Sequence, residues 1–437
     1  MTVVWCEHAW LGGRGVERGV VVQIDAGEIT AVERGVTAPA DAISLAGLTL
    51  PGLANAHSHA FQRRLRARTQ RRRGSFWTWR EAMYEAVAEL SPDGYEELAT
   101  ATFGEMALAG ITLVGEFHYL HHAPDGTPYA DPNEMGNAVA RAAENAGLRL
   151  TLLDTCYLHG GIGTPVTGSQ RRFADASVDA WAERVDALTA TATRRIGAAA
   201  HSVRALGPEE LADVAAWAGA RAAPLHAHVS EQRRENEECL AEYKRTPVEL
   251  LAEAGCLSER FTAVHATHVT ERDRALLGSS HSRCCLCPTT ERDLADGIGG
   301  AAALTSAGAA LALGSDSNAV VDIFEEARAV ELDERLASEQ RVNHEPADLL
   351  TAATAGGYAA LGWNGGAIRP GACADLVTIG LDSVRLAGTP VDDLVPAVVY
   401  AAHPADVRHV MIGGRWVVRD GAHLRVDVPA ELERVLR

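Results

Sequence analysis

Four short clusters of histidine and acidic residues, each directly after an apolar run, constrain the fold of this 437-residue chain most strongly. They are His57-Ser58-His59, His226 to Glu231, His265 to His268, and Gly314-Ser315-Asp316-Ser317. Two imidazoles two residues apart on a strand point to the same side and can bind one ion. Borderline-soft divalent ions such as zinc take imidazole nitrogens together with a carboxylate oxygen. The order of the clusters therefore predicts a fold that brings four strand ends to one metal centre.

Short apolar runs alternate with longer segments rich in Ala, Glu and Arg along the middle of the chain. This alternation is typical of repeated βα units and a parallel sheet. We expect eight core strands, near 48–57, 112–117, 149–155, 196–201, 223–229, 261–267, 283–288 and 311–316, with helices between them, for example over 208–220. Eight such units predict an α/β fold, a (β/α)₈ TIM-type barrel over residues 51–369. Its chemistry is expected at the carboxyl ends of the strands, where the clusters fall.

Residues 1–50 and 370–437 differ from this middle part, because their short strand-like runs are broken by Gly and Asp. Neither end could bury a core by itself. We expect the two ends to pair into one small β-sandwich that flanks the barrel, entered at Pro51 and left near Pro370.

Charge and cysteine content limit the class of partner and the compartment. A formal net charge of −18 disfavours nucleic acid and anionic membranes, and the basic block from Arg63 to Arg73 is best interpreted as a solvated loop. The sequence shows neither a signal peptide nor an apolar run that could span a bilayer. We expect a cytoplasmic protein with reduced cysteines, in which Cys284, Cys285 and Cys287 are buried apolar side chains and not metal ligands.

The candidate metal ligands end three of the predicted strands. His57 and His59 end the first, His228 ends the fifth and Asp316 ends the eighth. A divalent ion held there would lower the pKa of a bound water toward neutrality and supply hydroxide. Strand spacing alone also allows His226 to be the ligand, one layer deeper in the barrel. The strand-end position and the spacing to Glu231 favour His228.

Two further residues are candidates for moving protons. Glu231 lies three residues beyond His228, where it can face the metal without binding it, and we interpret it as a proton shuttle. The alternative is a solvated glutamate that opens the next helix. His265 ends the sixth strand and could orient the attacking hydroxide, whereas His268 lies further into the loop. Such a site suits a deaminase that attacks a C=N carbon and expels ammonia.

Four polar residues near strand ends could converge on a substrate anion: Arg80, Tyr119, His201 and Arg204. Arginine is the natural partner of carboxylates, and an acidic protein needs cations at the mouth of the site to bind an anion. Taken singly, each of these residues could equally be a surface or salt-bridged side chain.

The chain resembles the amidohydrolase superfamily in its one-metal aminohydrolase branch, and within it the formimidoylglutamate deiminase family. The resemblance covers essentially the whole length. The segments that carry it are PGLANAHSHAFQR (51–63), SFWTWREAMY (75–84), GEFHYLHH (115–122), HSVRAL (201–206), HAHVSEQ (226–232), VHATH (264–268), CPTTERDLADGI (287–298) and GSDSN (314–318).

This resemblance implies one zinc ion per chain and a small acyclic formimino amino acid as the substrate, and it allows a homodimer. The implied reaction converts N-formimidoyl-L-glutamate to N-formyl-L-glutamate and ammonia in histidine degradation. The implied roles are zinc binding by His57, His59, His228 and Asp316; proton and hydroxide handling by Glu231, His265 and Asp316; contact with the formimino group by Gln62; and binding of the glutamate part by Arg80, Tyr119, His201 and Arg204.

The single lysine, Lys244, bears on the number of metal ions. Many two-metal amidohydrolases bridge their ions with a carbamylated lysine on a strand between the first His pair and the next His. That interval contains no lysine here, so one metal is favoured. Two positions depart from the family's pattern, Asn318 where His follows GSDS and Asp293 where Asn is usual, and both are expected near the substrate.

Two other functions share parts of this pattern. A deaminase of guanine or a related heterocycle would use the same metal chemistry, but a flat ring needs stacking walls and amide groups that read its edge. The Arg80 and Arg204 segments favour a glutamate-like substrate instead. A non-catalytic scaffold with the same fold predicts that at least one ligand is lost, and none is missing.

Overall fold

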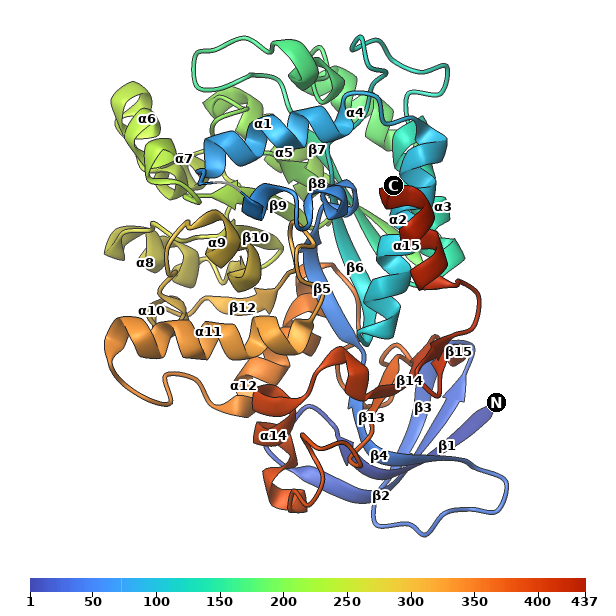
Figure 1. Cartoon of the computed structure of the whole chain (residues 1–437). Helices are drawn as coiled ribbons and strands as arrows, with labels where there is room; N and C mark the ends of the chain where they lie inside the picture. Colours follow the sequence, from blue (N-terminus) through green and yellow to red (C-terminus); the bar gives the residue numbers. More distant parts are fainter. Residues whose placement is uncertain (72) are drawn as a thin grey trace.

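The computed structural model describes residues 1–71 and 73–437, which form two eight-stranded sheets and the helices around them (Figure 1). One sheet is entirely parallel and its strands follow each other in chain order. Its strands are β5 (Leu53–Ser58), β6 (Ile111–His118), β7 (Arg149–Cys156), β8 (Arg194–Ala200), β9 (Leu225–Val229), β10 (Phe261–His265), β11 (Arg283–Leu286) and β12 (Ala310–Leu313).

The first and last of these strands meet, so the parallel sheet closes into a barrel. A parallel bridge joins Ser58 to Asp316 just beyond β12. The N–H of Asp316 donates to the carbonyl of His57 at 2.9 Å, and that of His59 donates to the carbonyl of Asp316 at 3.0 Å. Gly314 permits this close approach, because a Cβ there would lie 2.8 Å from the Cβ of His57. The predicted TIM-type barrel is confirmed, and its seam lies between the first and the last polar cluster.

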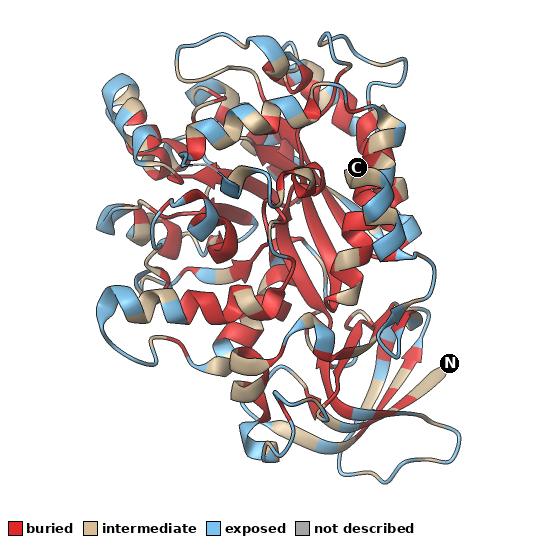
Figure 2. Ribbon diagram, in the orientation of Figure 1, coloured by how far each residue is buried: buried red, intermediate tan, exposed pale blue. Residues whose placement is uncertain are grey.

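Helices cover the outside of the barrel and bury their inner faces against it (Figures 1 and 2). The helix expected at 208–220 is α5, and its proline stands in the first turn, where the missing N–H costs nothing. The helices along the barrel are α1 (Phe76–Val87), α2 (Pro92–Leu108), α3 (Glu134–Ala146), α4 (Val178–Asp186), α5 (Pro208–Ala220), α6 (Arg233–Tyr243), α7 (Pro247–Glu253), α8 (Glu271–Ser279), α9 (Pro288–Leu294), α10 (Ala301–Ser306), α11 (Ile323–Ser338), α12 (Pro346–Thr351) and α13 (Gly357–Ala360).

Both chain ends contribute to the second sheet, which flanks the barrel (Figure 1). Its order is β16-β15-β14-β13-β4-β1-β2-β3. The strands are β1 (Thr2–Trp10), β2 (Val16–Asp25), β3 (Glu28–Glu33), β4 (Ile43–Pro51), β13 (Leu376–Ile379), β14 (Val407–Ile412), β15 (Arg415–Arg419) and β16 (Ala422–His423). Two helices follow strands of this C-terminal part, α14 (Leu394–Ala401) and α15 (Val428–Leu436), and α15 lies beside α2 of the barrel (Figure 1).

The strand expected at 48–57 is in fact two strands in two different sheets. It divides at Gly52, where an added Cβ would lie 2.2 Å from Oγ1 of Thr112, so no side chain fits. Residues before this glycine complete β4, and those after it begin the barrel with β5. A continuous apolar run conceals such a change of sheet, because both halves are buried strands.

No cysteine belongs to the groups of possible metal ligands among the described residues. Cys284, Cys285 and Cys287 are buried thiols, and burial raises the pKa of Cys284 to about 12. Lys244 is exposed at the end of α6, where its Nζ donates to the carbonyl of Ala241 at 2.6 Å. Within the described residues, no helix is long and apolar enough to cross a membrane.

Candidate active site

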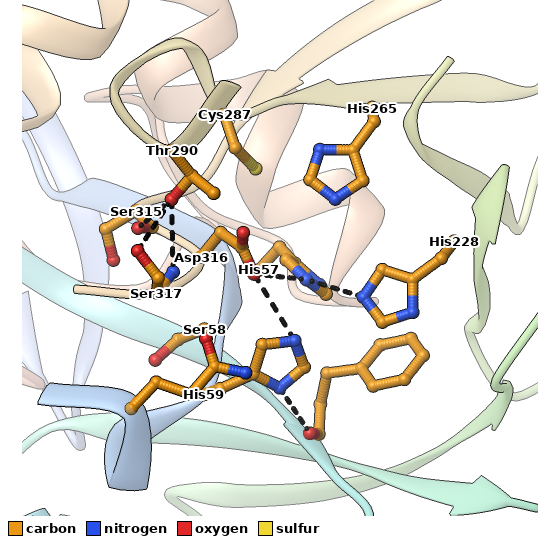
Figure 3. Close-up of polar contacts among 12 residues, drawn as sticks. His57, Ser58, His59, His228, His265, Cys287, Thr290, Ser315, Asp316 and Ser317 are labelled. Atoms are coloured by element: carbon orange, nitrogen blue, oxygen red, sulfur yellow. Dashed lines mark hydrogen bonds and ion pairs between the residues drawn. The ribbon is translucent and has the colours of Figure 1, made fainter. Parts of the chain in front are cut away.

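The four predicted metal ligands come together at the carboxyl end of the barrel, and all of them are buried (Figure 3). His57 lies on β5, His59 directly after it, His228 on β9, and Asp316 after β12. Nε2 of His57 is 3.1 Å from Oδ1 of Asp316 and 3.2 Å from Nε2 of His228. Nε2 of His59 is 3.3 Å from the same Oδ1 atom. Three imidazoles and one carboxylate therefore surround a single point.

Hydrogen bonds fix the tautomers of two of these histidines. Nδ1 of His59 lies 2.9 Å from the carbonyl of Phe117, and Nδ1 of His228 lies 3.0 Å from the carbonyl of His201. A carbonyl only accepts, so each Nδ1 carries the proton and each Nε2 keeps a lone pair that faces the cluster. Such hydrogen bonds from the outer ring nitrogen to a backbone carbonyl are typical of histidines that bind a metal. The residues present therefore fit a divalent cation.

Burial and charge favour the protonation states that a cation needs. Burial lowers the pKa of His57 to about 3, although the hydrogen bond with Asp316 opposes it, and burial also holds His228 well below its usual pKa. Burial would raise the pKa of Asp316, but the hydrogen bond and charge of His57, with the neighbouring histidines, lower it below its usual value. Neutral imidazoles and an ionised carboxylate are the forms that coordinate metals.

His265 lies as close to the cluster as the ligands do. One possible ligand atom each from His57, His228, His265 and Asp316 lies within 4.8 Å of the others, a set that includes His265 and leaves out His59. However, Nδ1 of His265 is 3.3 Å from Glu291 and Nε2 is 3.8 Å from Glu231. Burial would lower its pKa, but the charge of Glu231 and the bond to Glu291 raise it to about 10. A protonated imidazole cannot bind a metal, so His265 suits proton transfer better than coordination.

Unusual backbone geometry marks the same residues. His265 has φ 69°, Asp316 has φ 44° and Ser230, next to Glu231, has φ 52°. This left-handed region disfavours residues that have a Cβ and persists only where the surroundings impose it. Three such residues around one cluster support a functional site there.

Glu231 follows β9 and lines the cavity, and it is not in the group of possible metal ligands. Its side chain is 6% exposed, and its Oε2 lies 3.5 Å from Nη2 of Arg204. Burial raises the pKa of Glu231, while the charges of His265 and Arg204 oppose that rise. Its position fits a group that exchanges a proton with a molecule in the cavity.

The two alternative histidines lie elsewhere. Nε2 of His226 is 2.9 Å from the carbonyl of Ala360, and its ring does not line the cavity, so the deeper strand position belongs to the barrel core. His268 is in the loop after β10 and is also absent from the cavity wall.

A small cavity of about 50 Å³ opens beside the cluster. It is lined by His59, His228, Glu231, His265 and Asp316 together with the five residues predicted to bind substrate, Gln62, Arg80, Tyr119, His201 and Arg204.

Polar groups of this wall keep bonding capacity for a ligand. Nε2 of Gln62 donates to the hydroxyl of Tyr119 at 3.0 Å, whereas its buried Oε1 has no partner among residues 1–71 and 73–437. The guanidinium of Arg80 lies 5.0 Å from the ring of Trp77, and in the described part of the chain it forms no ion pair. An acceptor suited to N–H groups and an unpaired cation therefore face the same space.

Most of the apolar residues that line the cavity were not predicted as site residues from the sequence. Helix α1 lies across the barrel end (Figure 1), and its Phe76, Trp79, Met83 and Tyr84 line the cavity with Arg80. Tyr157 directly follows β7, a strand-end position that could have marked it in advance. Phe173 directly follows a short 3₁₀ helix, Gly168–Arg172, which was not predicted. Glu291, which contacts His265, lies within the CPTTE segment.

Neither position that departs from the family's pattern lines the cavity, so our expectation that both lie near the substrate is wrong. Nδ2 of Asn318 donates to the carbonyl of His59 at 3.1 Å, and its Oδ1 accepts from Ser315 at 2.7 Å, so Asn318 fastens the barrel seam. Asp293 accepts from Gln70 at 2.7 Å on the exposed surface.

A second buried group, His118, His121 and Asp154, also has three possible ligands. Its carboxylate is already bound by Arg184, at 2.8 and 2.9 Å, and by the indole of Trp181 at 3.2 Å. A cation would have to displace a buried guanidinium, so this group belongs to the structural core.

Comparisons with known proteins agree with this geometry. The model of the amidohydrolase family matches residues 48–417. Formimidoylglutamate deiminase of Pseudomonas aeruginosa is 39% identical over 97% of this chain and 96% of its own. A 5-methylthioadenosine/S-adenosylhomocysteine deaminase of Halobacterium salinarum is 32% identical over 95% and 91%. An adenosine deaminase from Xanthomonas campestris, solved with bound zinc, shares the fold with a TM-score of 0.84 at 23% identity over 99% and 96%.

Proposed function

The chain belongs to the amidohydrolase family, and from this premise we propose that it hydrolyses N-formimidoyl-L-glutamate to N-formyl-L-glutamate and ammonia. The observation that carries the proposal is the presence of two arginines, Arg80 and Arg204, in the same cavity as the histidine and aspartate cluster. A linear diacid needs cationic anchors, whereas the reacting amidine must lie at the cluster. The relative from Pseudomonas aeruginosa supports the same substrate. The expected setting is histidine degradation in the cytoplasm.

We assign the metal to His57, His59, His228 and Asp316, with zinc favoured because its ligands are imidazole nitrogens and a carboxylate oxygen. A divalent ion bound there polarises water and lowers its pKa toward neutrality. The barrel of residues 51–369 would carry all of these groups, and residues 1–50 and 370–437 would form the flanking domain.

The side chains around the cluster account for the proton movements. In the proposed reaction a water oxygen bonds to the amidine carbon while its proton passes to an oxygen of Glu231. Glu231 returns this proton to the amidine nitrogen and then carries the second proton from the new hydroxyl to the same nitrogen, so that the C–N bond breaks as the C=O bond forms and ammonia departs. His265, 3.8 Å from Glu231, would orient the attacking water and stabilise the charge that develops on it. Asp316 remains ionised and accepts a hydrogen bond from the same water.

The remaining wall residues would hold the substrate. The unpaired Oε1 of Gln62 can accept an N–H of the formimino group, with Tyr119 holding the amide in place. Arg80 and Arg204 would bind the carboxylates, and His201 would add a polar contact at the wall.

One metal ion per chain is expected in the purified protein. Of the two possible ligand groups in the described part of the chain, the second has its carboxylate bound by Arg184, and the barrel strands carry no lysine. Elemental analysis should therefore give close to one equivalent of a divalent ion, and a chelator should abolish ammonia release until zinc is restored. Close to two equivalents would contradict the one-metal site.

Arg204→Met should lower kcat/KM for N-formimidoyl-L-glutamate by about 10- to 100-fold, because losing a charge-assisted contact costs on the order of 1.5–3 kcal/mol. Metal content and fold should stay intact. The loss should shrink for formimino compounds without the matching carboxylate, because no anion is then left unpaired. Equal losses for all of these substrates would argue against a carboxylate contact.

A deaminase of purines or related rings is the second candidate function. Phe76, Trp79, Tyr157 and Phe173 in the cavity wall could stack on a flat ring, and the relative from Halobacterium salinarum is named for such a substrate. An ammonia-release assay across formimino amino acids, guanidino acids and purines separates the two functions. Release from N-formimidoyl-L-glutamate alone supports the proposal, and release from purines alone refutes it. A non-catalytic scaffold would release none and would purify without stoichiometric metal.

A further inference from the structure

A second buried carboxylate contacts one of the two arginines of the cavity. Oε2 of Glu235, on α6, lies 3.3 Å from Nε of Arg204, and its Oε1 accepts the backbone N–H of Ser230 at 3.0 Å. The side chain of Glu235 is fully buried and that of Arg204 is only 10% exposed. A buried carboxylate is costly unless it is paired and hydrogen-bonded, so this contact holds both side chains in place.

The guanidinium of Arg204 lies between two acids. Nε faces Glu235 and the hydroxyl of Ser202, each at 3.3 Å, whereas Nη2 reaches Glu231 at the longer distance of 3.5 Å. The ring of Phe76 lies 5.7 Å from the guanidinium carbon. Among the described residues Nη1 has no hydrogen-bond partner, and the side chain lines the cavity. Arginine has five N–H donors, so donors remain for an incoming anion.

We propose that Glu235 is a positioning residue that keeps Arg204 from pairing with Glu231 alone, so that the guanidinium stays available to a substrate carboxylate. This rests on the proposed function. Without Glu235, the nearest acid to Arg204 is Glu231, and a buried guanidinium closes on the charge that remains. That closure would occupy the carboxylate anchor and the proton shuttle together. Glu235 therefore favours substrates that carry a carboxylate, although it touches neither the substrate nor the metal.

The amide of a glutamine cannot replace this carboxylate. Oε1 of Glu235 accepts the N–H of Ser230, and its Oε2 forms an ion pair with Arg204 but accepts no hydrogen bond within the described residues. Glutamine offers one acceptor oxygen, and its NH₂ group would face a donor. Aspartate keeps both acceptor oxygens on a shorter side chain, so it should restore part of the function. Glu237, exposed on the same helix, provides a matched control for the same change.

A double-mutant cycle on the metal-loaded full-length protein tests this inference. Glu235→Gln should lower kcat/KM for N-formimidoyl-L-glutamate by about 10- to 100-fold, with Glu235→Asp less affected and Glu237→Gln unchanged. In an Arg204→Met background the same Glu235→Gln change should cost less than about 3-fold, because residues that act through one contact are not additive. If Glu235 had only a structural role, the fold-losses of the two single variants would instead multiply in the double variant.

The outcomes separate the two proposals. If the wild-type protein turns over N-formimidoyl-L-glutamate but the losses of the two variants are additive, only the role of Glu235 is overturned. Wild-type protein that does not turn it over overturns the proposed function, and the role of Glu235 falls with it. If Glu235→Gln fails to fold, judged by circular dichroism and metal content, the cycle is run with Glu235→Asp, for which additive losses again contradict the inference.

Discussion

Glu231→Gln is expected to keep the metal and to lose about 10² to 10⁴ of kcat, the usual contribution of a general acid–base group. The amide cannot take a proton from the attacking water or return it to the leaving nitrogen. Its shape is nearly that of glutamate, and Glu231 is not a ligand, so metal content and fold should not change. Steady-state ammonia release and elemental analysis on the same preparation measure both effects.

Glu237→Gln, at an exposed position of α6, is the matched control and should behave as wild type. Activity of Glu231→Gln within a few-fold of wild type would make Glu231 a wall residue without a chemical role. Loss of metal in that variant would instead place Glu231 among the ligands.

Asp316→Asn should remove activity through the metal itself. Its Oδ1 lies 3.1 Å from Nε2 of His57 and 3.3 Å from Nε2 of His59. Asp316 is the one anionic side chain among the proposed ligands. A neutral amide is a poorer ligand, and even the loss of a residue behind a ligand costs about 10- to 100-fold in affinity or activity. We expect at least a loss of about 100-fold in metal affinity, measured by competition with a chelator.

Asp293→Asn makes the same change at an exposed position outside the cavity and should leave metal affinity and turnover unchanged. If Asp316→Asn retained a full equivalent of tightly bound metal, Asp316 would not be a ligand and the proposed ligand set would be wrong.

The barrel could be predicted from the sequence because its strands are nearly continuous apolar runs separated by helical segments. The cluster residues could be placed because a parallel barrel collects its strand ends at one face. The change of sheet at Gly52 could not be predicted, since the strands on both sides are equally buried. His228 could be chosen over His226 from its strand-end position and its spacing to Glu231, although both histidines point to the same side of one strand.

The partners of the site residues were harder to predict than the residues themselves. The sequence suggested Arg204 as a carboxylate anchor but could not show that Glu231 and Glu235 lie on either side of it. Asn318 looked like a substrate residue because it follows the cluster, yet its amide bonds to the barrel seam. Such contacts join segments far apart in the chain, and no local pattern encodes them.

The most direct test of the central claim is kcat/KM measured in parallel on N-formimidoyl-L-glutamate, N-formimino-glycine and guanine with the metal-loaded wild-type protein. N-formimidoyl-L-glutamate is expected to be the best substrate, and guanine is expected not to be deaminated. N-formimino-glycine should be turned over less efficiently because it lacks one carboxylate. The proposed function is contradicted if guanine is the best of the three.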